Sequence, residues 1–131
     1  MKPAAGGDWP SISIVTPSFN QGHFIEATIQ SVLSQQYPNL EYLVVDGGST
    51  DGTLDILRRY EGQLRWISES DHGQAEAINK GLRLASGDIL AFLNSDDLYL
   101  PGALRRVGGY FIAHPGAAWV TGRCITVDAE L

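Results

Sequence analysis

The sequence predicts an α/β protein of three layers (α/β/α), in which helices cover both faces of a mostly parallel β-sheet. Two observations predict this fold class. From residue 11 onward, short apolar runs alternate with segments whose apolar residues recur at helical spacing. The apolar runs are nearly continuous, as in strands buried on both faces. The 131 residues suit one domain, and residues 1–10 are expected to form a flexible leader in front of it.

The first expected strand, residues 11–17, ends at Pro17. In the following segment, 22–36, Ile25, Ile29 and Val32 share one face of a helix that must stop before Pro38. Residues 40–48 form a continuous apolar strand that runs into a glycine turn.

The middle of the chain repeats this alternation. In the expected helix 49–60, Ser49, Thr50 or Asp51 is predicted to be the cap. A short strand is expected over 63–69. Helix 73–87 is expected to bury Ala75, Ile78, Leu82 and Ala85 and to end at the C-cap Gly87.

The last third contains one more expected helix between two expected strands. Residues 88–93 are predicted to form a strand, and Pro101 suits the first turn of a helix over 100–111. Residues 117–127 are predicted to form one strand, or two with a break at Gly122, and Cys124 within them is expected to be buried.

Composition and charge exclude several classes of function. The net charge of −6 argues against non-specific binding of nucleic acid, which depends on cation–phosphate contacts. A phosphate-bearing ligand would therefore need a local positive charge from a helix N-terminus, a lysine or a bound metal. The single cysteine excludes an intrachain disulfide and a cysteine-rich zinc site. Because no apolar run is long enough to span a bilayer, a cytoplasmic protein is expected.

A polar loop follows each of the first four expected strands. These loops are residues 16–22, 46–52, 68–73 and 94–97, and three of them contain aspartate. Ligands of open parallel sheets bind beyond the carboxyl ends of the strands. The sequence therefore predicts a binding site where these four loops meet.

Two positions in these segments each have two interpretations. The Asp46 carboxylate could accept a hydrogen bond from a base such as uracil, or it could simply organise the turn at Gly47 and Gly48. Lys80 could reach a diphosphate, or it could be an ordinary surface lysine.

The adjacent acids Asp96 and Asp97 are predicted to bind a hard divalent cation. Mg²⁺ and Mn²⁺ prefer carboxylate oxygens, and Mg²⁺ commonly combines one or two carboxylates with substrate phosphates. Helix capping is the alternative, but a four-residue gap separates Asp97 from Pro101 and capping would leave one acid unexplained.

Two long stretches resemble family 2 glycosyltransferases of the GT-A (nucleotide-diphospho-sugar transferase) fold. They are "ISIVTPSFNQGHFIEATIQSVLSQQYPNLEYLVVDGGSTDGT" and "SESDHGQAEAINKGLRLASGDILAFLNSDD", and the resemblance covers residues 11–127. It implies an enzyme of hexosyltransferase type (EC 2.4) in polysaccharide biosynthesis. Such an enzyme transfers a sugar with inversion, using Mn²⁺ or Mg²⁺. The expected donor is a UDP-sugar and the expected acceptor is a glycan or a lipid-linked hydroxyl, with the inner face of the membrane as a further location.

The resemblance also assigns roles to individual residues. Residues that match the family's nucleotide-binding positions are Thr16, Pro17, Asn20, Asp46, Gly48, Asp71, Asn79, Lys80 and Asp96. Asp46 matches the acid that contacts the base, and Asp71 matches an acid near the base and ribose. Asp97 matches a metal ligand, with Asp96 shared between ribose and metal.

The sequence departs from the family in two respects. Asn94 stands where the metal motif usually has its first acid. The catalytic base of the family comes from its C-terminal half, so it is expected beyond Leu131. Residues 11–131 are therefore expected to be the nucleotide-sugar-binding half of a truncated GT-A domain.

Two other functions stay open on the sequence. A sugar-phosphate nucleotidyltransferase also uses a metal, but it needs a basic loop after the first strand, and "TPSFNQG" contains no Lys or Arg. In a non-catalytic nucleotide-binding module, the acids would serve only as caps and turns.

Overall fold

The computed structural model describes residues 8–130, which form a four-stranded sheet and four helices. In chain order the elements are β1 (Ile12–Ser18), α1 (Ile25–Leu33), β2 (Leu40–Asp46), α2 (Thr53–Arg59), β3 (Arg65–Ser68), α3 (Gln74–Leu84), β4 (Ile89–Phe92) and α4 (Ala103–Ala113). The predicted α/β class is thus confirmed.

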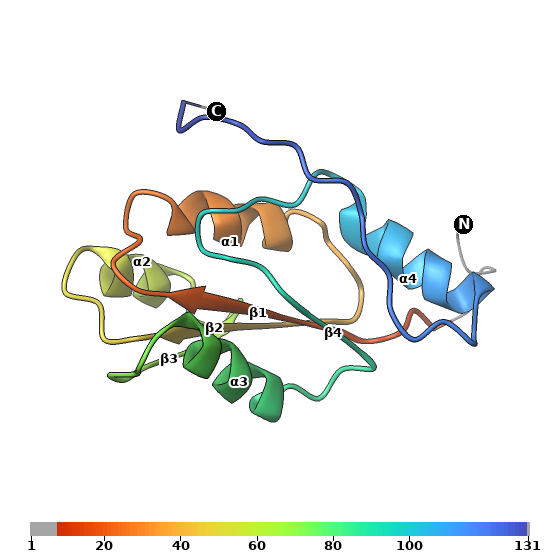
Figure 1. Cartoon of the computed structure of the whole chain (residues 1–131), viewed down its shortest axis with the longest axis horizontal. Coiled ribbons are helices and arrows are strands. Elements are labelled where there is room, and N and C mark those ends of the chain that lie inside the picture. The colour runs from red at the N-terminus through yellow and green to blue at the C-terminus, as the bar shows by residue number, and fades with distance from the viewer. Residues whose placement is uncertain (1–7, 131) are drawn as a thin grey trace.

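All neighbouring strands are parallel, in the order β3-β2-β1-β4. β1 is buried along its whole length and pairs with β2 from Ile12 opposite Leu40 to Ser18 opposite Asp46. Because every strand runs the same way, all four carboxyl ends lie at one edge of the sheet, as Figure 1 shows.

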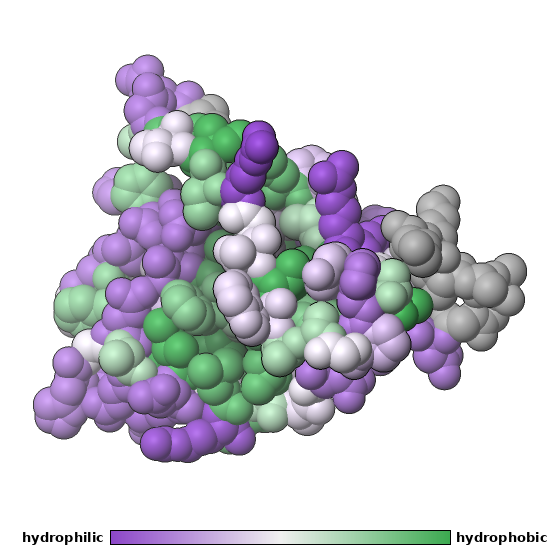
Figure 2. Space-filling model, turned by 45° about the vertical axis from the view of Figure 1, so that its right-hand side comes forward, coloured by the Kyte–Doolittle hydropathy of each residue, from purple (hydrophilic) through white to green (hydrophobic). Residues whose placement is uncertain are grey.

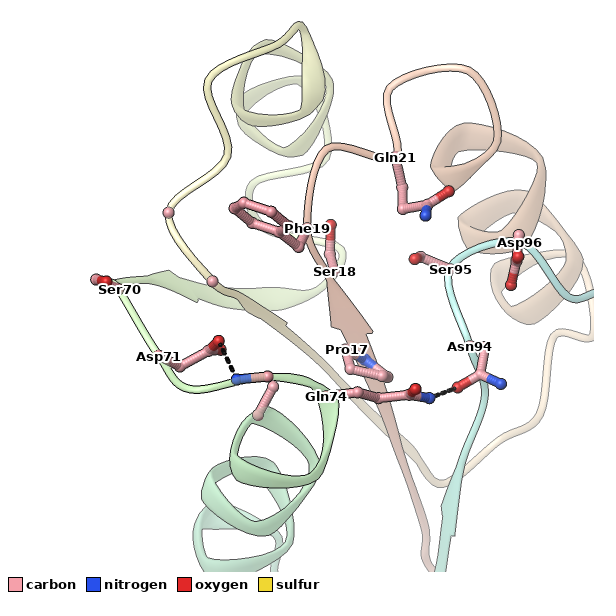
Figure 3. A pocket seen from close by; sticks show the side chains of 14 residues that line it. Pro17, Ser18, Phe19, Gln21, Ser70, Asp71, Gln74, Asn94, Ser95 and Asp96 are labelled. Carbon is pink, nitrogen blue, oxygen red and sulfur yellow. Dashed lines mark hydrogen bonds between the residues drawn. The ribbon is translucent and has the colours of Figure 1, made fainter.

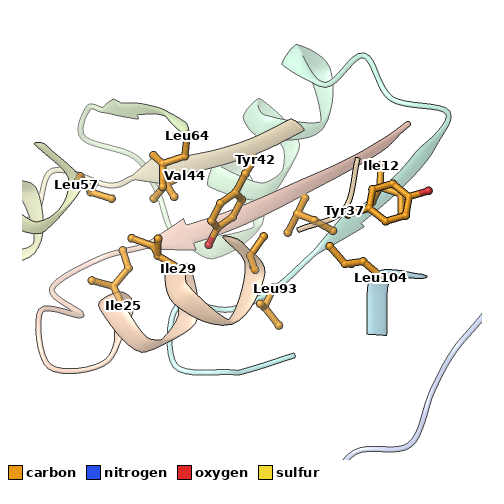
Figure 4. Packing of buried hydrophobic residues seen from close by; sticks show 12 residues of the cluster. Ile12, Ile25, Ile29, Tyr37, Tyr42, Val44, Leu57, Leu64, Leu93 and Leu104 are labelled. Carbon is orange, nitrogen blue, oxygen red and sulfur yellow. The ribbon is translucent and has the colours of Figure 1, made fainter. Parts of the chain in front are cut away.

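Helices lie on both faces of the sheet (Figure 1). On one face, Ile12, Ile14 and Val44 of the sheet pack with Ile29 of α1 and Leu104 of α4 (Figure 4). This cluster contains most of the buried apolar side chains and is the main core.

The opposite face is covered by α3 alone, which contacts β1 and β2. Here Val15, Leu43 and Val45 pack against Ala77. A Cβ on Gly81 would lie 2.3 Å from Cγ1 of Val15, so the helix approaches the sheet too closely for any larger residue. The expected stripe is confirmed only in part: Leu82 and Ala85 pack against this cluster, Ile78 is half-buried and Ala75 is exposed. The fully buried positions of α3 are Ala77 and Gly81, because small residues permit this approach.

Helix boundaries differ from the predicted ones in three places. Helix α2 begins at Thr53 after the N-cap Gly52, and no side chain caps it. Ala85, not Gly87, is the C-cap of α3. Gly87 instead lies against β1, where an added Cβ would be 2.5 Å from the Ser13 hydroxyl. Pro101 precedes α4, which starts after Gly102 in the left-handed region.

The expected strand over 117–127 is absent from the structure. Residues 117–128 belong to no helix or strand, and Trp119 is 76% exposed. Cys124 is exposed rather than buried. A strand needs a neighbouring strand as well as β-forming residues, and this segment pairs with none in the described chain.

The expectation that helices bury both faces of every strand is also wrong for β4. Leu90 and Phe92 are about half exposed, and their partners in β1, Ser13 and Val15, lie on the face that α3 covers. Helix α3 packs over β1 and β2 and leaves β4 open on this side. Figure 2 shows apolar residues gathered in the lower middle of the surface that it displays.

No helix within residues 8–130 combines the length and the apolar character needed to cross a membrane.

Candidate functional site

A cavity of about 670 Å³ lies at the carboxyl ends of the strands. Its walls come from the four loops that the sequence predicts to converge: residues 17–19 and 21, 47–48, 70–74 without 72, and 94–96, with Ala77 of α3. This volume lies within the range of small-molecule sites. Figure 3 shows side chains of all four loops around it.

Asp46 lies beneath this cavity rather than on its wall. The side chain is fully buried, and its Oδ2 accepts hydrogen bonds from the N–H groups of Gly48 (3.0 Å) and Ser49 (2.8 Å) and from the Ser68 hydroxyl (2.7 Å). The Ser49 hydroxyl donates to Oδ1 at 2.5 Å. The carboxylate therefore organises the glycine turn and joins it to β3, and its contact with a base stays a prediction.

Asp71 is on the cavity wall. Its Oδ1 accepts a hydrogen bond from the N–H of Gly73 at 3.0 Å. The carboxylate also covers Gly47, where an added Cβ would lie 2.9 Å from Oδ1. Of the two acids predicted to contact the nucleoside, Asp71 is thus the one that the cavity exposes, and Gly47 is the residue that leaves room for it.

Of the predicted residues in the first loop, one lines the cavity and two make contacts within the protein. Pro17 lines the cavity. Thr16 is buried, with its hydroxyl 2.9 Å from that of Tyr42. Asn20 is used to tie two loops together, since its N–H donates to the Ser49 hydroxyl and its Oδ1 accepts from the N–H of Thr50, both at 2.8 Å.

A second tie between these loops is made by Asp51. Its Oδ1 accepts from the hydroxyl and the N–H of Thr53, and its Oδ2 accepts from the N–H of Gly22 at 3.0 Å. The hydrogen bonds from Thr53 and Gly22 lower the pKa of Asp51. Asp51 thus orders the turn before α2, although it is not the cap of that helix.

Of the helix motif that includes Asn79, Lys80 and Gly81, no residue lines the cavity. The Lys80 ammonium lies 2.8 Å from Oε1 of Glu69 and 3.7 Å from Oε1 of Glu76. The hydrogen bond to Glu69 raises the pKa of Lys80. Lys80 would have to leave Glu69 to reach a diphosphate, so its phosphate contact stays a prediction.

In the loop after β4, the two adjacent acids Asp96 and Asp97 have different surroundings. Asp96 lines the cavity, and within residues 8–130 no hydrogen bond or ion pair engages its carboxylate. Asp97 does not line the cavity: its Oδ2 accepts from Nδ2 of Asn94 at 3.3 Å, and its carbonyl oxygen accepts from the Thr28 hydroxyl at 2.8 Å. Asp97 is therefore tied into the loop, while Asp96 is free to contact a ligand.

Several wall residues were not predicted from the sequence: Ser18, Phe19, Gln21, Ser70, Gln74 and Ser95. Five of them are neighbours of predicted residues in the same loops, so proximity in the chain was the available signal, whereas Gln74 is the first residue of α3. Ser18 also has a buried hydroxyl without a hydrogen-bond partner among the described residues. Of the histidines, His72 is almost fully exposed beside Glu76 and lies off the wall.

The donor set fits a hard divalent cation that shares its coordination with a ligand. Among residues 8–130 no group of three or more His, Cys, Asp or Glu side chains could enclose a metal ion by itself. Asp96 on the wall, with Asp97 next to it in the chain, offers carboxylate oxygens of the type that Mg²⁺ and Mn²⁺ accept alongside phosphate oxygens.

Comparison with known proteins identifies relatives of this chain. The model of the family described as "Glycosyl transferase family 2" matches residues 13–129 of this chain. The putative teichuronic acid biosynthesis glycosyltransferase TuaG of Bacillus subtilis is 44% identical over 101 residues, which cover 74% of this chain and 40% of TuaG. The Escherichia coli glucosyltransferase WfgD, which uses UDP-Glc and a diphosphoundecaprenol-linked acceptor, is 41% identical over 71% of this chain and 38% of its own. The chain thus spans less than half of these relatives.

Solved structures share the fold. S. aureus TarS (residues 1–349) in complex with UDP-GlcNAc has a TM-score of 0.76 and 26% identity, over 89% of this chain and 37% of that one. The Pyrobaculum calidifontis mannosyltransferase in complex with GDP-Man and Mn²⁺ has a TM-score of 0.71 and 31% identity, over 78% and 32%. The fold is therefore that of GT-A glycosyltransferases, and the chain belongs to glycosyl transferase family 2.

Proposed function

We propose that this chain holds the nucleotide-diphosphate sugar of an inverting glycosyltransferase. The observation that carries the proposal is the cavity at the carboxyl ends of four parallel strands, with Asp71 and Asp96 on its wall. Relatives that share this sheet were crystallised with UDP-GlcNAc, with UDP and Mn²⁺, and with GDP-Man and Mn²⁺.

The wall residues divide the donor between them. We assign Asp71, Gly47 and Gly48 to the nucleoside, because the Asp71 carboxylate on the wall can accept hydrogen bonds and the two glycines leave room beside it. We assign Asp96 to the diphosphate end, where it would act through a divalent cation. When bound, this cation supplies Lewis-acid neutralisation of the charge on the diphosphate.

Transfer itself exchanges one bond at the anomeric carbon. The acceptor hydroxyl oxygen bonds to that carbon from the opposite face, the bond to the diphosphate oxygen breaks, and the nucleoside diphosphate leaves. The hydroxyl proton passes to a general base. The chain spans less than half of the relatives that it matches, and none of its own residues is assigned as this base, so the 131 residues alone are expected to bind a donor without efficient transfer.

The geometry favours the opposite ranking of the two acids as metal ligands. The sequence favours Asp97 as the metal ligand, whereas Asp96 has the free carboxylate on the wall. We therefore propose Asp96 as the principal ligand. Asp97 orders the loop beside it.

Calorimetry tests this proposal with UDP and GDP, each with and without Mn²⁺. Wild-type protein is expected to bind UDP more tightly when Mn²⁺ is present. Asp96→Asn should weaken this binding on the order of 10- to 100-fold, the cost of a lost contact to a charged group. Asp97→Asn should weaken it less, and the exposed control Asp55→Asn should leave it unchanged.

Three results would count against the proposal. Absence of nucleotide binding would remove the donor site, and binding that ignores Mn²⁺ would remove the metal. A larger loss for Asp97→Asn than for Asp96→Asn would restore the ranking predicted from the sequence. Tighter binding of GDP than of UDP would leave the donor site in place and would change only the nucleotide base assigned to the donor.

A further inference from the structure

Three polar side chains form a row from the first residue of α3 to the loop after β4. The Gln74 amide nitrogen donates to the Asn94 side-chain oxygen, and the Asn94 amide nitrogen donates to Oδ2 of Asp97 at 3.3 Å. Figure 3 shows Gln74 and Asn94 pointing toward each other across the cavity. Gln74 is absent from the site predicted from the sequence, although it lines the cavity.

Asp97 at the end of the row determines which group donates and which accepts in each hydrogen bond. The Asp97 oxygen accepts this hydrogen bond, so Asn94 presents its NH₂ group to it. The Asn94 oxygen then faces Gln74, which must present its own NH₂ group. Both amide orientations are thus set by Asp97.

The row adds a side-chain hydrogen bond to the backbone hydrogen bonds that hold Asp97. The backbone of this residue is already held, because its N–H donates to the Asn94 carbonyl oxygen at 3.1 Å and its own carbonyl oxygen accepts from Thr28. Among the described residues, Asn94 is the only hydrogen-bond partner of the Asp97 side chain. Without Gln74, the half-buried Asn94 amide could rotate and turn its oxygen toward the Asp97 carboxylate. Gln74 opposes that rotation from the other side of the cavity.

We propose that Gln74 is a positioning residue that acts through Asn94 on the Asp96–Asp97 turn. This inference rests on the proposed donor and metal site. It also gives Asn94 a role that an acid at the same position could not fill. An aspartate at position 94 could accept from Gln74 but could not donate to Asp97, and it would repel both neighbouring acids. The neutral amide holds Asp97 and leaves Asp96 free for the ligand.

The first measurement tests the row without any ligand. Side-chain amide signals of Asn94 are recorded by ¹⁵N–¹H NMR and identified by their loss in Asn94→Leu. The signals of Asn94 are expected to move toward free-asparagine positions in Gln74→Leu and to stay in place in the exposed control Gln63→Leu. Unmoved signals in Gln74→Leu would show that Gln74 does not hold Asn94 and would overturn the inference.

The second measurement is the Mn²⁺-dependent affinity for UDP in a double-mutant cycle. Gln74→Leu should weaken binding about 3- to 10-fold, as expected for one hydrogen bond. Gln74→Glu should do so at least equally at neutral pH, because a carboxylate cannot donate to the Asn94 oxygen. In the Asn94→Leu background, Gln74→Leu should cause no further loss.

The outcomes separate this inference from the proposed function. A full additional loss in the Asn94→Leu background would mean that Gln74 contacts the ligand directly, and the positioning role would be wrong. If wild-type protein bound no UDP, the proposed donor site would fail, while the NMR measurement would still decide whether Gln74 orients Asn94.

Discussion

Asp46 shows how one buried carboxylate can organise a loop at the end of a strand. It receives four hydrogen bonds, from Gly48, Ser68 and both donors of Ser49. Because a fully buried acid is costly without such partners, this arrangement holds the turn that brings Gly47 under Asp71. The residue that sequence reasoning assigned to the base is thus, in the structure, part of the framework of the cavity.

Asp46→Asn is therefore expected to reduce the free energy of unfolding by about 1–3 kcal/mol, because the new NH₂ group would face backbone N–H donors. Urea denaturation measures this as a lower midpoint with an unchanged m-value. The exposed control Asp55→Asn should cause no comparable loss. Unchanged stability together with lost UDP binding would instead support direct contact of Asp46 with the base.

At the level of single elements, the approach of α3 to β1 is the tightest contact that a glycine permits within residues 8–130. Gly81 is buried on the helix, and Cγ1 and Cγ2 of Val15 lie 2.3 and 2.9 Å from where its Cβ would be. Gly81 belongs to a motif that the family resemblance places near the nucleotide. Its observed role is packing, which sets the height of α3 and hence the position of Gln74 at the start of the helix.

Gly81→Ala is expected to lower stability by about 1–3 kcal/mol, the usual cost of overpacking. This loss should appear even though alanine is the better helix former by about 1 kcal/mol. Thermal unfolding followed by circular dichroism measures it. Gly116→Ala is the matched control, since a Cβ there would meet nothing within 4 Å. An unchanged or raised Tm in Gly81→Ala would mean that Val15 can move aside at little cost.

Across the whole molecule, Glu41 links elements that are far apart in the sequence. Its carboxylate accepts from the Ser13 hydroxyl at 2.6 Å and from the N–H of Ser86 at 2.8 Å, and Arg65 lies 3.6 Å away. It thereby joins β1, β2, β3 and the segment between α3 and β4. The hydrogen bond from Ser13, followed by that from Ser86, lowers the pKa of Glu41.

A lowered folded-state pKa makes this contribution to stability dependent on pH. The contribution is complete above the ordinary pKa of 4.5 and is lost as the pH falls through the lower folded value. Glu41→Gln should therefore reduce stability at pH 7 and flatten its decline below pH 4.5. Urea midpoints measured at pH steps from neutral into this acid range test the prediction, with the exposed Glu61→Gln as control. Equal slopes in wild type and Glu41→Gln would show that Glu41 does not carry the acid sensitivity.

The open face of β4 is a second property of the whole molecule. Leu90 and Phe92 leave apolar surface on the α3 side of the sheet, and β4 is an edge strand that pairs only with β1. Sequence reasoning found the apolar run at 88–93 but could not tell that one of its faces is exposed. Period-two burial in the structure, with Ile89 and Ala91 on the core side, shows which residues are covered.

The sequence by itself determined the alternation of the four strands and four helices and the parallel sheet, and it predicted that four polar loops meet at one edge, where the structure has a cavity. Continuous apolar runs identify buried strands, and their polar ends must meet at one edge when the strands are parallel. The same local pattern could not show that 117–127 lacks a strand partner, because pairing is a property of two segments. Nor could it separate the free Asp96 from the tied Asp97, or place Gln74 opposite Asn94. Only the tertiary structure decided these points, because each depends on which distant side chain arrives beside a residue, and spacing along one chain does not contain that information.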